Sequence, residues 1–189
     1  MPGMQEVDAV NSTRAMGLKF AQLDMTYAQI RAEGITSPID FGCFALEFFE
    51  AAQAVDNDVG MRPGYEIVPP VTVLYLIGHS IELSLKAFLL YRGVPLNQLR
   101  GRMYGHDLHA CLSKANELGL AENVALSEDE QWVIEVLNQT YAVKELEYAV
   151  RGVKEYPTYG PLERAAVRLF NGIAPLIGHM GRIDGYLDV

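Results

Sequence analysis

The fold of this chain is decided by one long apolar stretch, VTVLYLIGHSIELSLKAFLLY, residues 71–91. Its length suits a single helix, and the Gly-Val-Pro that follows it is typical of a helix end. A membrane span is disfavoured, because His79, Glu82 and Lys86 lie near the middle, where each charge would be costly in lipid. We therefore predict the core helix of a soluble protein.

The three ionisable residues of this helix form a polar stripe. At about 100° per residue, His79, Glu82 and Lys86 fall within about 60° of one another. The opposite side is apolar and carries Leu74, Ile77, Ile81, Leu85 and Phe88. Glu82 precedes Lys86 by four residues, the favourable order for an ion pair. Two interpretations stay open: an exposed pair that contributes a few tenths of a kcal/mol, roughly, or a buried pair that fixes the helix register between helices or subunits.

Helical periodicity continues on both sides of this stretch. Residues 11–34 repeat apolar side chains at three- and four-residue steps. Ser37 stands before a proline, and Ser127 stands before three acids, as expected of residues that cap helices. The last helical stretch, 161–187, contains Pro175, which predicts a kink there. Trp132, the single tryptophan, is predicted to lie in the core.

One region departs from the helical pattern. The stretch KELEYAVRGVKEYPTYGP alternates polar and β-forming residues, which predicts a short irregular or extended segment near residues 145–160. No series of alternating strands and no internal repeat is present. We therefore predict an all-α bundle of about five or six helices, in a single domain over residues 1–189.

Composition limits the function. Lys and Arg number 15 against 24 Asp and Glu, a formal net charge of −9. This balance argues against a protein that coats nucleic acid regardless of sequence, although it leaves room for a local basic groove. Cys43 and Cys111 fit no metal-ligand pattern, and we predict two reduced, buried thiols. The N-terminal MPGMQEVDAV lacks the pattern of a secretory signal, so we expect a cytoplasmic protein.

A second polar cluster, RGRMYGHDLH, occupies residues 100–109. His106 or Asp107 could cap the helix that follows. Arg100, Arg102 and His106 could instead contact phosphate, with His106 as a general base, if a second surface completed the site. His106 and His109 could share a face as metal ligands, but spacing ties no third ligand to them. We therefore predict neither a metal nor a cofactor.

A third cluster, VRGVKEYP, places two basic residues among tyrosines. Arg151 and Lys154 could grip single-stranded nucleic acid together with neighbouring aromatic rings. Three glutamates dilute the positive charge, at positions 145, 147 and 155. A packed connecting segment is therefore the competing interpretation.

The order of these motifs resembles a known family. HSIELSLKAFLLYRG, then a polar loop, then GHDLHACLSKA is similar to the HEPN domain of prokaryotic proteins, over roughly residues 72–118. The later LEYAVRGVKEYP is similar to a segment that often follows in such chains. The resemblance implies an up-and-down helical bundle that commonly dimerises. Many members are ribonucleases or parts of toxin–antitoxin and defence systems, and others bind nucleotides or are non-catalytic.

The resemblance also implies a catalytic signature, an Arg followed after four to six residues by a His. Arg100 and His106 match this spacing, but they span a loop instead of starting a late helix. We therefore expect a homodimeric, non-catalytic module for interaction or for binding RNA or nucleotide, with an antitoxin-like protein as a possible partner. In it Arg102, Asp107, Arg151 and Lys154 would bind, and His79, Glu82 and Lys86 would organise the bundle. The alternative is a metal-independent ribonuclease that uses Arg100 and His106.

Overall fold

The computed structural model describes residues 36–148 and 154–184. Contacts divide the chain into two units, Met1–Thr36 and Ser37–Val189, and the bundle belongs to the second. The helix predicted within residues 11–34 lies outside the described residues, as does Arg151.

The described part of the chain contains six α-helices and no strand, so the predicted all-α bundle is confirmed. The helices are α3 (Pro38–Val55), α4 (Val71–Tyr91), α5 (Leu96–Arg100), α6 (Leu108–Glu117), α7 (Glu128–Tyr141) and α8 (Tyr159–Ile177). A π-helical turn, η2 (Asp56–Gly60), extends α3, and a 3₁₀ turn, η3 (Leu120–Glu122), follows α6.

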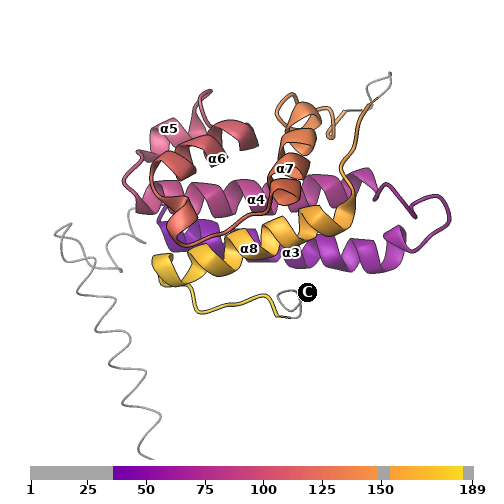
Figure 1. Ribbon diagram of the computed structural model, residues 1–189, viewed down its shortest axis with the longest axis horizontal. Coiled ribbons are helices and arrows are strands. Elements are labelled where there is room, and N and C mark those ends of the chain that lie inside the picture. The colour runs from indigo at the N-terminus through magenta and orange to yellow at the C-terminus, as the bar shows by residue number, and fades with distance from the viewer. Residues whose placement is uncertain (1–35, 149–153, 185–189) are drawn as a thin grey trace, which may run out of the picture. The chain divides into compact units, whose positions relative to one another are not determined.

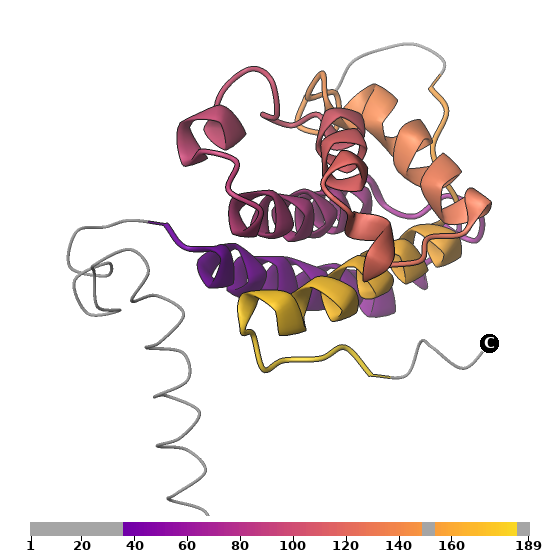
Figure 2. The ribbon, with the colours of Figure 1, turned by 60° about the vertical axis from the view of Figure 1, so that its left-hand side comes forward.

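Helix α4 is the centre of the bundle. Figure 1 and Figure 2 show α3 and α8 on one side of α4, and α5, α6 and α7 on the other. Covered from both sides, α4 buries polar as well as apolar residues. It is apolar and long enough to cross a membrane, yet 78% of its most apolar 18-residue stretch is buried inside the fold. It is therefore a core helix, as predicted.

Local signals in the sequence set the helix ends. The Ser37 N–H donates to the Asp40 carboxylate (2.7 Å), which closes the first turn of α3. In α7 the Glu130 N–H donates to the Ser127 hydroxyl (3.2 Å), and the Ser127 N–H donates to the Glu130 carboxylate (2.8 Å). These reciprocal bonds satisfy N–H groups that a helix start leaves unpaired. Both predicted caps are confirmed.

Three details differ from expectation. Cys43 is exposed, so its predicted burial is wrong, whereas Cys111 is buried as predicted. The last helix does not continue to residue 187, because Gly178 adopts a left-handed conformation (φ 79°) and ends α8 just after Pro175. Trp132 is 56% exposed, so its predicted place in the core is wrong. Helix α7 turns Val133 and Leu137 to the core instead, and its tryptophan lies on the solvent side. The predicted irregular segment is confirmed over its described residues. These form turns up to residue 148 and have no regular secondary structure from 154 to 158.

Candidate functional site

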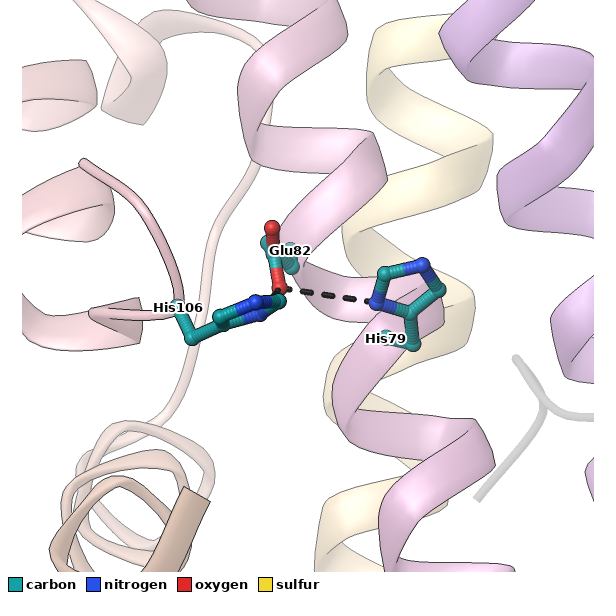
Figure 3. A group of neighbouring side chains, drawn as sticks. All are labelled: His79, Glu82 and His106. Carbon is teal, nitrogen blue, oxygen red and sulfur yellow. Dashed lines mark hydrogen bonds and ion pairs between the residues drawn. The ribbon is translucent and has the colours of Figure 1, made fainter. Parts of the chain in front are cut away.

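The candidate site is built around a buried carboxylate. Glu82, in the middle of α4, is only 2% exposed. His79 and Lys86 reach it from the same helix, His106 from the loop before α6, and Tyr141 from the last position of α7. Figure 3 shows the rings of His79 and His106 approaching the carboxylate from two sides. We call these five side chains the Glu82 cluster.

The contacts of Glu82 are short and use both carboxylate oxygens. The Lys86 ammonium donates to Oε1 (2.5 Å), and the Tyr141 hydroxyl donates to Oε2 (2.6 Å). His106 Nδ1 lies 3.0 Å from Oε2. His79 Nδ1 lies 3.5 Å from Oε2 and 2.9 Å from the Tyr141 hydroxyl. The buried carboxylate thus has a partner on each oxygen, as an ionised group inside a protein requires.

The Glu82–Lys86 pair is buried, which decides between the two interpretations of the polar stripe. The Lys86 side chain is 9% exposed and also donates to the Gly105 carbonyl (2.6 Å). The pair therefore joins α4 to the loop before α6. A buried pair of this kind need not add net stability, but removing one partner leaves a buried charge without its counterion.

The protonation of the cluster follows from its surroundings. Burial alone would raise the pKa of Glu82, but hydrogen bonds from His79, Lys86 and Tyr141 and the Lys86 charge outweigh it and lower the pKa to about 2. Burial and the adjacent carboxylate raise the pKa of Tyr141 well above its usual range. At neutral pH Glu82 is therefore an acceptor and Tyr141 a donor. An ionised carboxylate can only accept hydrogen bonds. A neutral His106 that is hydrogen-bonded to Glu82 therefore carries its ring proton on Nδ1.

Both histidines of the cluster are partly open to solvent. The side chains of His79 and His106 are 21% and 32% exposed. His79 is held by the edge of Phe48 (ring centroids 4.4 Å apart) and by Tyr75, whose ring is nearly parallel to it (6.1 Å). Each imidazole directs Nδ1 toward the buried centre. Nε2, on the opposite edge of each ring, is the nitrogen that does not contact Glu82.

The other residues predicted near residue 100 are found on α5, in the loop after it and at the start of α6. Arg100 is the exposed last residue of α5, and it is not one of the four partners of Glu82 described above. Arg102 is exposed in the loop between α5 and α6. Asp107 caps α6, where its carboxylate accepts from the Ala110 N–H (2.9 Å). Asp107 therefore has a structural contact, as the capping interpretation predicted.

The remaining predicted residues are engaged elsewhere. His109 pairs with Glu135 (2.5 Å) on an exposed face, so His106 and His109 bind different carboxylates. Lys154 pairs with Glu145 (3.0 Å) and its side chain is only 12% exposed. This contact favours the packed connecting segment over a nucleic-acid grip.

The contacts of His106 and Tyr141 with the polar stripe of α4 were not predicted. His79 was assigned to the structural stripe alone, although its position three residues before Glu82 is visible in the sequence. Tyr141 lies 59 residues from Glu82, and no spacing in the sequence signals their contact. The ligand atoms of His79, Glu82 and His106 all lie within 4.8 Å of one another, which makes them a group able to hold a metal ion.

A separate pocket of about 640 Å³ lies between residues 123–125 and the end of α8. Its lining includes Arg168 and His179. Arg168 pairs with the buried carboxylate of Glu130 (2.9 Å), and His179 Nδ1 accepts from the Gly181 N–H (3.0 Å). These polar groups serve the local fold, so the Glu82 cluster is the stronger candidate site.

Comparisons with protein-family models, with curated proteins and with solved structures find no match for this chain.

Proposed function

We propose that this chain is a HEPN-like, non-catalytic helical module that binds RNA or nucleotide phosphates. The binding face would be α5 and the loop from it to α6. One observation carries the proposal: residues 87–106 contain three basic residues, all exposed, and no acid, in a chain of net charge −9. Such segregation of charge concentrates positive potential where a phosphate could bind.

The burial pattern supports the same face. Arg100 and Arg102 are exposed, and His106 follows with a partly exposed ring. The nearby negative charge of Glu82 is buried and paired with Lys86, so it does little to reduce the positive surface above it. Tyr91 (42% exposed) adds an aromatic ring on which a base could stack, and Met103 (64% exposed) adds apolar surface in the same segment.

Binding of a short fluorescent single-stranded RNA, measured by anisotropy, tests this proposal. We expect the double variant Arg100→Gln/Arg102→Gln to bind at least about tenfold more weakly, because two phosphate contacts are lost. The dependence of log K on log salt concentration should become less steep by about 1.4, because each phosphate contact with a single strand contributes about 0.7 to the slope.

The matched control is Arg62→Gln/Arg182→Gln, which removes the same charge from two exposed arginines elsewhere. Its binding should stay close to that of the unaltered chain. Equal weakening by both double variants would show that net charge alone sets the affinity, and the proposed face would be wrong.

Dimerisation, an antitoxin-like partner and a cytoplasmic location belong to this proposal and rest on the HEPN resemblance. Sedimentation equilibrium of the full chain tests the homodimer directly. A mass of one chain at all concentrations would remove that part of the proposal.

A second candidate is a metal-independent ribonuclease, favoured because one carboxylate holds both His79 and His106. His106 would take the proton of the 2′-hydroxyl as its oxygen attacks phosphorus. Protonated His79 would donate to the 5′-oxygen as the P–O5′ bond breaks, leaving a 2′,3′-cyclic phosphate and a 5′-hydroxyl. Arg100 would stabilise the developing charge on the phosphate.

Cleavage of RNA in the presence of EDTA tests this second candidate. We expect His106→Ala to lower the rate by about 10²-fold or more, the usual contribution of a general acid or base. His109→Ala, an exposed histidine outside the cluster, should leave the rate unchanged. Equal activity of His106→Ala and the unaltered chain would exclude the assignment.

A further inference from the structure

We propose that His79, Glu82 and His106 bind one divalent transition-metal ion of the zinc type. The ligand atoms would be Nδ1 of each imidazole and Oε2 of the carboxylate. This inference goes beyond the phosphate-binding module. The metal site shares His106 with the proposed binding face, but it uses neither Arg100 nor Arg102 and requires no nucleic acid.

The distances suit a small ion. Zinc bonds of about 2.0–2.2 Å in tetrahedral geometry place neighbouring ligand atoms about 3.4 Å apart. Oε2 of Glu82 lies 3.0 Å from His106 Nδ1 and 3.5 Å from His79 Nδ1, on either side of that value. The three ligand atoms lie within 4.8 Å of one another, so small rotations of two partly exposed rings would bring them to bonding distance.

The surrounding contacts hold the ligands in place. Lys86 binds the other carboxylate oxygen, Oε1, and so orients Oε2 toward the histidines. Phe48 and Tyr75 fix the ring of His79. His106 immediately precedes the cap of α6, which anchors the end of its loop. Such outer contacts set ligand orientation in metal sites and contribute strongly to affinity.

The ligand types select the metal. Two imidazole nitrogens and one carboxylate favour zinc and related transition metals over Mg²⁺ and Ca²⁺, which prefer oxygen ligands. Binding requires His79 and His106 each to carry its proton on Nε2 instead of Nδ1, a change of tautomer that releases no net proton. Three protein ligands leave a fourth position for water or another ligand, as in catalytic zinc sites.

Isothermal titration of the full chain with ZnCl₂, after dialysis against EDTA and then into buffer without chelator, tests the site. We expect about one equivalent of zinc per chain and no comparable binding of MgCl₂. His79→Ala and His106→Ala should each weaken zinc binding by at least about tenfold, since each removes one of three ligands. His109→Ala and His179→Ala are matched controls that remove a histidine outside the group, and they should bind as the unaltered chain does.

Circular dichroism of each variant shows whether it is folded. The absorption spectrum of Co²⁺ added to the unaltered chain gives a readout that needs no variant, because coordination by the protein changes the visible bands of the hydrated ion. A spectrum identical to that of hydrated Co²⁺ would overturn the proposal. So would zinc affinity that falls as much in the control variants as in the site variants.

Discussion

Replacing Glu82 with Gln should lower the free energy of unfolding by about 3–5 kcal/mol, the usual effect of removing one partner of a buried ion pair. The amide keeps the size of the side chain but removes the charge. The Lys86 ammonium, only 9% exposed, would then lose its counterion and keep only neutral acceptors such as the Gly105 carbonyl. Urea denaturation in the presence of EDTA measures the change, so that bound metal cannot contribute.

The double variant Glu82→Leu/Lys86→Met is the informative control. It removes both charges, so we expect it to regain most of the lost stability. Glu117→Gln removes one partner of the exposed Lys114–Glu117 pair and should change stability by less than about 0.5 kcal/mol. A double variant as unstable as Glu82→Gln would mean that His106 and Tyr141, not the ion pair, account for the loss.

Replacing Gly172 with Ala should destabilise the bundle by about 1–3 kcal/mol, the range for overpacking a core. A Cβ at this position of α8 would lie 2.5 Å from Val124 Cγ2 and 2.7 Å from the Asn123 backbone carbonyl oxygen. The carbonyl belongs to the main chain and cannot rotate away as a side chain could. This clash outweighs the gain of about 1 kcal/mol that Ala normally brings to a helix interior.

Gly160→Ala, in the first turn of the same helix, is the matched control for thermal denaturation. Its Cβ would meet the Arg164 guanidinium at 3.6 Å, an ordinary contact. We expect stability to stay the same or to rise slightly, because Ala restricts the unfolded chain. If both glycine variants lowered the melting temperature equally, close packing of α8 against residues 123–124 would not be the cause.

Most of the fold could be predicted because its signals are local. The stretch expected to be helical at residues 71–91 is α4, and the serines expected to cap α3 and α7 do so. Trp132 could not be placed, since its burial depends on which face of α7 packs on the bundle. That choice depends on helices distant in the sequence, so the residues near Trp132 do not reveal which face is buried.

The candidate site was predictable only in part, for the same reason. The pairing of Glu82 with Lys86 follows from their spacing on one helix, whereas the burial of the pair depends on helices packed on both sides of α4. The contact between Tyr141 and Glu82 depends on where α7 packs in the bundle. The joint action of Arg100 and His106 stays a prediction.

The bond from Lys86 to the Gly105 carbonyl has a consequence for recognition. It ties the loop that carries Arg102 and His106 to the most deeply buried helix of the bundle. A loop held in this way has lost much of its freedom when the chain folds, so a ligand need not supply the entropy of ordering it. The loop would therefore meet its ligand as a preformed surface, and selectivity would depend on fit more than on adaptation.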